Sequence, residues 1–250
     1  MTESSEVREF YDRFSGRVLI RDFYYVNLRH EAIKSLCRRF IEPGSAVLEV
    51  GCGAGIISRF LGKSASRVFA IDISPKNVEL AREFAASSNM SFDVIDIVKQ
   101  GESLQKHGPF DVILAADVIE HIPKGEYAGV FSTLEGLLSE SGRLMLSFPS
   151  PEIQEYMKTH QPDDVQVIDE SIELTDLLSV TSLKPLYFRY CDIFGKNDYV
   201  HAVLSTERPC AARGGGLTPL QWISSRLRKY RWRLGNLGFL RRVKRKGIVD

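Results

Sequence analysis

The sequence has few cysteines and no long apolar run. The four cysteines, Cys37, Cys52, Cys191 and Cys210, are scattered without a CxxC pair, so neither a structural zinc site nor a disulfide framework is indicated. No stretch approaches the roughly eighteen consecutive apolar residues of a membrane span, and the amino terminus, MTESSEVREFYDRF, has no basic region followed by an apolar run. We therefore expect a protein of a reducing, cytoplasmic compartment.

A cluster of metal ligands is also missing from the sequence. His107, His121, His160 and His201 are far apart and have neither the close spacing nor the carboxylate partners of a metal site. The sequence therefore predicts no metal, and metal-dependent chemistry is disfavoured.

Acidic residues are almost absent from the last part of the chain. Residues 213–250 contain 11 Lys or Arg and a single acid, a balance of +10 within a chain whose net charge is +1. Residues 1–212 thus hold the other 22 basic residues and 31 acids, a balance of −9. The glycine-rich segment 211–219 predicts a linker before the basic residues. The expected domains are a helical cover over 1–40, a main domain over 41–206 with an excursion at 149–182, and a linker with a basic tail over 207–250.

Apolar runs of strand length alternate with amphipathic stretches, which is typical of a parallel sheet covered by helices on both faces. The predicted helices include 6–14, 27–40 and 171–182, and the predicted strands are 46–50, 67–71, 91–95, 110–115, 142–148, 186–193 and 200–205. The last two strands are joined only by Phe194–Tyr199, which is too short for a parallel crossover. The sequence predicts an α/β fold with a doubly wound, seven-stranded, mostly parallel sheet whose last strand is antiparallel.

The strongest local signal is a glycine-rich turn between an apolar strand and a helix. In VLEVGCGAGIIS, which starts at Val47, the glycines Gly51, Gly53 and Gly55 permit a sharp turn and a close backbone approach to a ligand. Doubly wound sheets bind their ligands at this end of the strands. The spacing is GxGxG, whereas the dinucleotide fingerprint is GxGxxG, and such a short pattern also occurs by chance.

Acidic residues lie near the ends of three successive predicted strands: Glu49 within the first strand, and Asp72 and Asp96 directly after the second and the third. Glu49 gives no advantage to a pyrophosphate but suits a ligand with an ammonium group, such as S-adenosylmethionine (SAM), which carries an α-ammonium and a sulfonium. Asp72 is placed to accept hydrogen bonds from ribose hydroxyls, although it could merely cap the next helix. Asp96 is placed to accept a bond from an adenine amino group, with Ile73 and Ile97 on the two faces of the ring. The alternative for Asp96 is a surface turn.

The segments 47–58, 68–73 and 110–122 resemble the motifs of class I SAM-dependent methyltransferases, in particular the branch with the ubiquinone-biosynthesis O-methyltransferases. This resemblance covers about residues 10–150 and implies a Rossmann-like methyltransferase fold with SAM as cofactor. It implies that Arg29 reaches the methionine carboxylate and that Ala116 contacts the cofactor. The family pattern has one more residue between its asparagine and its arginine than this chain has between Asn27 and Arg29. The alternative is therefore that Arg29 is an ordinary surface arginine. The predicted cofactor site comprises Arg29, Glu49, Gly51, Cys52, Gly53, Gly55, Asp72, Ile73, Asp96, Ile97 and Ala116.

His121 is the candidate catalytic residue, because it resembles the histidine that family members place near the acceptor. An imidazole can deprotonate a hydroxyl near neutral pH; the alternative is a histidine that bonds a backbone carbonyl and shapes its loop. We expect a hydroxyl acceptor on a small molecule or a sugar-like unit, with an amine or carbon acceptor as the alternative. A nicotinamide-dependent oxidoreductase and a non-catalytic SAM-fold binding subunit are the rival interpretations.

The sequence does not identify the binding partner of the basic tail. Segment 116–119, after the fourth strand, has no Pro-Pro-Tyr or Pro-Cys signature of base-modifying methyltransferases, so nucleic acid is disfavoured as a substrate. Residues 217–246 mix arginines with large apolar residues, a composition that can lie on an anionic membrane or bind an acidic partner. Packing of this tail on the acidic main domain is the alternative.

Overall fold

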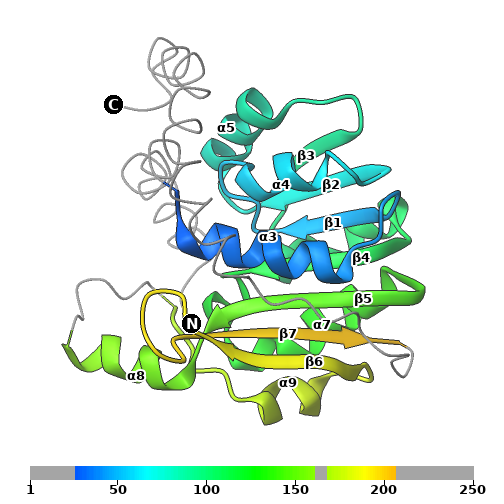
Figure 1. Ribbon diagram of the computed structural model, residues 1–250. Coiled ribbons are helices and arrows are strands. Elements are labelled where there is room, and N and C mark those ends of the chain that lie inside the picture. Colours follow the sequence, from blue (N-terminus) through cyan, green and yellow to red (C-terminus); the bar gives the residue numbers. More distant parts are fainter. Residues whose placement is uncertain (1–25, 161–167, 207–250) are drawn as a thin grey trace.

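Seven strands form one sheet in which β1 (Ala46–Val50) and β4 (Phe110–Ala116) are central neighbours. The computed structural model describes residues 26–160 and 168–206, and its strand order is β3-β2-β1-β4-β5-β7-β6 (Figure 1). The other strands are β2 (Arg67–Asp72), β3 (Met90–Val94), β5 (Leu138–Pro149), β6 (Lys184–Cys191) and β7 (Tyr199–Ser205).

The strand directions confirm the predicted doubly wound, mostly parallel sheet. Each neighbouring pair from β3 to β5 is parallel, whereas β7 runs antiparallel to both β5 and β6. Predicted and observed strand ends agree closely except for β5, which begins four residues early at Leu138 because Leu138 pairs with Phe110 beyond a register shift. The carboxyl ends of the parallel strands and the start of β7 therefore lie at one edge of the sheet, called here the carboxyl edge.

Helices cover both faces of the sheet. One apolar cluster joins the sheet to α3 (Leu28–Phe40), α4 (Ile56–Leu61) and α5 (Pro75–Ala85), and a second joins it to α6 (Ile97–Gln100), α7 (Tyr127–Gly136) and α9 (Leu174–Val180). The remaining elements are α8 (Pro151–His160) and the short 3-10 helices η2 (Gly101–His107), η3 (Ile119–His121) and η4 (Lys124–Glu126). No helix within the described ranges is long and apolar enough to cross a bilayer.

Polar caps set where the helices begin and end. The side chains of Asn27 and Ser74 accept hydrogen bonds from the first turns of α3 and α5. Helix α9 is shorter than the predicted helix over 171–182, because Thr181 and Ser182 leave the helix to bond the carboxylate of Glu135 on α7.

Several predicted features lie outside the described residues. They are the helix over 6–14, the rest of the predicted amino-terminal cover up to residue 25, and the linker and basic tail beyond residue 206.

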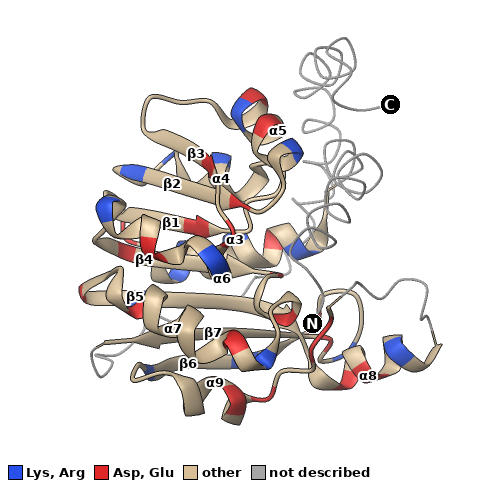
Figure 2. Cartoon of the chain, turned by 180° about the vertical axis from the view of Figure 1, so that it is seen from behind, with Lys and Arg blue, Asp and Glu red and all other residues tan. Residues whose placement is uncertain are grey.

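Charged residues lie mainly on the helices. Acidic and basic residues are interspersed on α5 and α8, whereas the inner strands carry few of them (Figure 2). Glu49 in β1 and Asp72 at the end of β2 are acids that the sheet nevertheless buries. Because burial of a carboxyl group is unfavourable unless it is hydrogen-bonded, these two residues need local partners, and both have them.

Candidate active site

The glycine-rich turn connects the end of β1 to α4 and is tied to β2. The backbone N–H groups of Gly51 and Cys52 both donate to the carbonyl of Ile71, at 2.8 and 3.0 Å. Gly55 has a φ of 76°, and a Cβ there would lie 3.0 Å from the Cβ of Ala81 on α5. The turn thus allows α4 and α5 to pack closely.

A neighbouring residue of the protein leaves no room for a side chain at Gly51. Its φ is 73°, and a Cβ would lie 2.3 Å from Cγ2 of Val118, which follows β4. From the sequence, this glycine was predicted to allow the close approach of a ligand. The structure adds that Gly51 also makes room for the segment after β4, so the turn and the end of β4 lie side by side.

Asp72 fastens the glycine-rich turn to the start of α5. Its Oδ2 accepts the backbone N–H of Gly53 at 2.9 Å, and its Oδ1 accepts the N–H of Ser74 at 2.9 Å and the side-chain amide of Asn77 at 3.1 Å. The residue is 7% exposed. A carboxylate held by several N–H donors at the carboxyl edge has the position and the fixed orientation expected of a ribose ligand.

Glu49 lies under the turn and bonds a hydroxyl within the protein. Its Oε2 accepts the hydroxyl of Ser58 on α4 at 2.5 Å, and the side chain is buried. Burial raises the pKa of Glu49 to about 8, since the Ser58 bond only partly offsets desolvation and nearby Asp72 adds repulsion. Glu49 is therefore largely protonated at neutral pH in this structure, and a cationic ligand beside it would favour its ionisation.

Replacement of Glu49 by glutamine tests this protonation. Because the pKa of Glu49 is about 8 in the fold against a usual 4.5, the native state keeps a proton that the unfolded chain releases. The free energy of unfolding of the wild type should thus fall as the pH rises from about 4.5 to 8. The Glu49→Gln variant has no carboxyl group to titrate at this position and does not lose this stability. The difference in the free energy of unfolding between the variant and wild type should therefore shift in favour of the variant across this pH interval, by roughly a few kcal/mol.

Denaturant unfolding at several pH values measures the difference. The matched control is Glu79→Gln on the exposed side of α5, which should run parallel to wild type. Parallel curves for Glu49→Gln as well would show that Glu49 is ionised in the fold.

Asp96 caps a helix at the neighbouring strand end. Its Oδ1 accepts the N–H groups of Val98 and Lys99 at 3.0 and 3.4 Å, so it is the N-cap of α6 and not a surface turn. The N–H of Ile95 donates to the carbonyl of Asp72, which places the two predicted nucleoside ligands at adjacent strand ends. Of the two expected ring contacts, Ile73 is half-buried, whereas Ile97 packs into the core beside α7.

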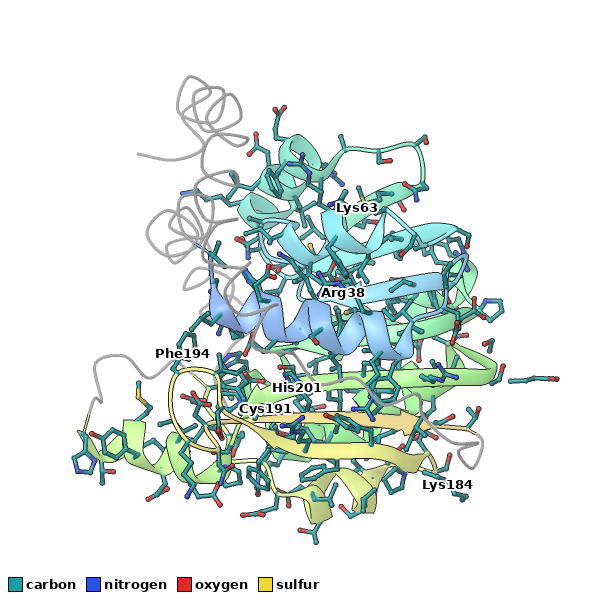
Figure 3. All side chains as sticks on the ribbon, viewed as in Figure 1. Arg38, Lys63, Lys184, Cys191, Phe194 and His201 are labelled. Carbon is teal, nitrogen blue, oxygen red and sulfur yellow. The ribbon has the colours of Figure 1, made fainter. Side chains whose placement is uncertain are left out.

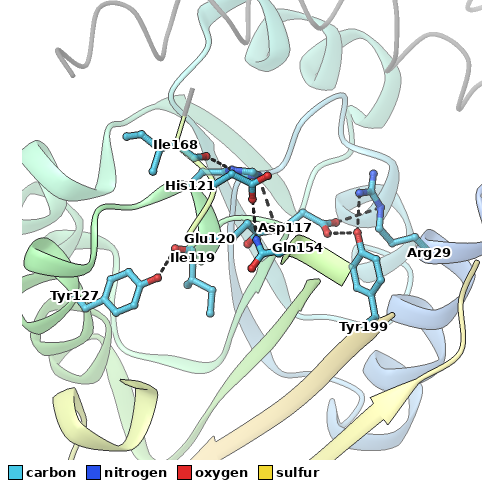
Figure 4. A network of polar contacts seen from close by, with 10 residues as sticks. Arg29, Asp117, Ile119, Glu120, His121, Tyr127, Gln154, Ile168 and Tyr199 are labelled. Atoms are coloured by element: carbon cyan, nitrogen blue, oxygen red, sulfur yellow. Dashed lines mark hydrogen bonds and ion pairs between the residues drawn. The ribbon is translucent and has the colours of Figure 1, made fainter. Parts of the chain in front are cut away.

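Arg29 belongs to a polar network at the end of β4 (Figure 4). Its Nε lies 3.2 Å from Oδ2 of Asp117, and its Nη1 donates to the hydroxyl of Tyr199 at 3.2 Å. The Tyr199 hydroxyl in turn donates to Oδ1 of Asp117 at 3.0 Å. Asp117 directly follows Ala116, the residue predicted to contact the cofactor. The structure thus brings Arg29 to the carboxyl edge beside the glycine-rich turn.

His121 ends η3 and contacts the excursion that follows β5. Its Nδ1 lies 2.8 Å from the carbonyl oxygen of Ile168; because a carbonyl only accepts, this nitrogen carries the proton and Nε2 holds the lone pair. Nε2 lies 3.8 Å from Oε1 of Glu120. Burial lowers the pKa of His121, although the Ile168 carbonyl and Asp169 oppose this effect. The imidazole is therefore neutral near pH 7. Its contact with the carbonyl of Ile168 is the one expected of a loop-shaping histidine, and its role as a base toward an acceptor stays a prediction.

Glu120, the middle residue of η3, is buried and contacts the excursion. Its backbone carbonyl accepts the N–H of Glu170 at 2.7 Å, and its side chain is 1% exposed. Desolvation, followed by repulsion from Asp117, raises the pKa of Glu120 well above its usual range. Nearby, the side-chain amide of Gln154 on α8 donates to Asp169 at 2.7 Å. These contacts fasten segment 168–170 over the loop that carries His121.

The remaining predicted residue of the turn is Cys52, whose thiol is buried and packs into the core beside α4. Burial raises the pKa of this thiol well above its usual value, so Cys52 contributes its backbone to the turn. Among residues 26–160 and 168–206, no group of three His, Cys, Asp or Glu side chains is arranged to hold a metal ion.

The sequence matches one family model along well over half of its length. The model, described as a methyltransferase domain, covers residues 25–186. The chain belongs to this family.

Relatives and solved structures agree with a methyltransferase domain. The ubiquinone biosynthesis O-methyltransferase of Xanthomonas campestris pv. campestris is 30% identical over 105 residues, covering 42% of this chain and 43% of the relative. The enzyme of the same name from Methylocella silvestris is 35% identical over 123 residues, or 48% and 46% of the two chains. The match thus spans less than half the length of these curated relatives.

A solved structure supports the fold over a larger share of the chain. The magnesium protoporphyrin IX methyltransferase from Synechocystis PCC 6803, crystallised with S-adenosylhomocysteine (SAH), superposes with a TM-score of 0.61 at 21% identity. The superposition covers 82% of this chain and 99% of the other. It confirms the Rossmann-like methyltransferase fold.

Two residues of the polar network around Arg29, Asp117 and Tyr199, were not predicted from the sequence. Asp117 follows Ala116 at a strand end, the same signal that identified Asp72 and Asp96. Tyr199 starts the strand that was predicted to be antiparallel, and this direction alone places its first residue at the carboxyl edge. Both residues could therefore have been found from local position, although their contact with Arg29 could not.

Proposed function

We propose that this protein is a SAM-dependent methyltransferase that modifies a hydroxyl group of a small-molecule or sugar-like acceptor. The observation that carries the proposal is the buried Asp72 carboxylate, which holds the glycine-rich turn at the carboxyl edge of a methyltransferase-family sheet. The curated relatives are named O-methyltransferases, which favours oxygen as the methylated atom.

The residues present fit the three parts of SAM. Asp72 and Asp96 at adjacent strand ends would hold the ribose and the adenine, with the half-buried Ile73 beside the ring. The backbone of Gly51 and Gly53 would lie along the cofactor, and Arg29 would bind the methionine carboxylate. When bound, SAM supplies a methyl group on a positively charged sulfur, which makes that carbon electrophilic.

The protein's own contribution is to align the acceptor, exclude water and accept a proton. Nε2 of His121 carries a lone pair, and the ring is neutral near pH 7, as a general base requires. The segment 168–170, which is hydrogen-bonded to η3 and α8, covers this side of the site. We infer that the acceptor hydroxyl approaches between this segment and the end of β4.

Titration calorimetry with SAM, SAH and NADH tests the proposed function. SAM and SAH are expected to bind in the micromolar range, whereas NADH should not bind, because the GxGxG turn and buried Glu49 do not suit a pyrophosphate. A screen with methyl-labelled SAM then identifies the acceptor atom. NADH binding without SAM binding would instead indicate an oxidoreductase, and tight SAM binding without turnover on any acceptor would favour a binding subunit.

A further inference from the structure

Two side chains from distant parts of the chain hold the guanidinium group of Arg29. Resting on the proposed function, we propose that Asp117 and Tyr199 are positioning residues that orient Arg29 toward the carboxylate of the methionine part of SAM. Their contacts form a closed triangle in which Nε faces Asp117, Nη1 donates to the Tyr199 hydroxyl, and that hydroxyl donates to Asp117 (Figure 4).

Tyr199 is a rigid support for this triangle. Its backbone pairs with Pro149 of β5 on one side and Cys191 of β6 on the other. The preceding residue, Asp198, accepts the N–H groups of Ile193, Phe194 and Gly195 and so closes the loop between the strands.

The ring of Tyr199 is also supported from the side. The ring of Phe194, which the same loop carries (Figure 3), lies edge-on at 6.4 Å from that of Tyr199. Burial and the neighbouring Asp117 carboxylate raise the pKa of Tyr199 well above 10, so its hydroxyl stays protonated and can donate to Asp117.

Asp117 places the triangle beside the glycine-rich turn. It has a φ of 55°, and its N–H donates to the carbonyl of Ser147 in β5 at 2.8 Å. The next residue, Val118, packs against Gly51, so Asp117 lies next to the turn. Arg29, which starts from the first turn of α3, is thus held over the place where the methionine part of the cofactor must pass.

The charges explain why orientation is needed. The ion pair with Asp117 compensates the positive charge of Arg29, so recognition of a carboxylate must depend on directed N–H groups more than on long-range attraction. An arginine side chain has many rotamers, and a guanidinium with fixed orientation loses less freedom when it binds. The Tyr199 hydroxyl is the contact that sets this orientation without adding charge.

Binding of SAM and of decarboxylated SAM to the wild type and to Tyr199→Phe tests the inference. Decarboxylated SAM lacks the carboxylate but keeps the nucleoside and the amine. We expect Tyr199→Phe to weaken SAM binding about five- to tenfold, the order of one typical net hydrogen bond, and to leave the affinity for decarboxylated SAM within about twofold. In an Arg29→Met background, the same substitution should have no further effect on SAM. Tyr190→Phe, on the exposed part of β6, is the matched control and should change neither ligand.

The outcomes separate this inference from the proposed function. If neither ligand binds the wild type, the proposed function itself fails. If both ligands bind the wild type equally, or if Tyr199→Phe weakens both to the same extent, the site binds SAM but Tyr199 does not orient Arg29 toward a carboxylate, and the inference is overturned. An undiminished effect of Tyr199→Phe in the Arg29→Met background would overturn it as well.

Discussion

Replacement of His121 by alanine is expected to lower kcat by ~10² to 10⁴, the usual contribution of a positioned general base, while the affinity for SAM stays within about threefold. The physical reason is that Nε2 of His121 has a lone pair at the carboxyl edge, and burial keeps the ring neutral by lowering its pKa. The deficit should narrow as the pH rises, because an acceptor hydroxyl that is already ionised needs no base.

Steady-state rates across a range of pH measure this effect. His107→Ala is the matched control, since His107 precedes β4 at the opposite edge of the sheet and stacks on Phe69; it should leave the rate unchanged. A loss of only a few fold at every pH would show that His121 acts through its bond to Ile168 and shapes the loop.

Asp72→Ala is expected to weaken SAM by roughly 1.5 to 3 kcal/mol, the order expected for loss of hydrogen bonds to a charged acceptor. The structure adds a second consequence. Without the carboxylate, the N–H of Gly53 and the amide of Asn77 lose a partner, so the variant should also be less stable than wild type.

Calorimetry on the folded protein, together with its unfolding temperature, separates the two effects. Asp72→Asn keeps the shape of the side chain but replaces one of its two acceptor oxygens by a donor. It should fold with lower stability, because the NH2 group faces an N–H group of the protein, and it should bind the ribose hydroxyls less well. Asp93→Ala, at an exposed position in β3, is the control for both measurements. Wild-type affinity in a folded Asp72→Asn protein would remove Asp72 from the cofactor site.

The fold was predictable because its determinants are local and periodic. Buried parallel strands are apolar along their whole length, and β1 was therefore predicted with its exact bounds. The short connection between β6 and β7 determined their antiparallel direction. The β5 start and the end of α9 were missed because they depend on partners far away in the sequence, namely Phe110 and Glu135.

Residues of the candidate site could be predicted only where they lie at or directly after the end of a strand. Asp72 and the glycines follow β2 and β1 directly, so their proximity follows from the parallel order. Arg29 and Tyr199, in contrast, are 170 residues apart, and no spacing rule connects them. Glu49 shows a further limit, because the sequence reveals its charge type but neither the burial that keeps it protonated nor the bond from the Ser58 hydroxyl that partly opposes this effect.

The antiparallel course of β7 makes the register of this one strand important for the chemistry. Tyr199, His201 and Val203 face α3, while Val200, Ala202 and Leu204 face α7. A slip by one residue would exchange these two sets, turning an imidazole into the apolar layer and an aliphatic side chain toward Asp117. A change in the preceding loop that shifts the pairing of β7 by one residue would therefore take Tyr199 away from Arg29, whereas a shift by two residues would preserve the alternation of the two faces.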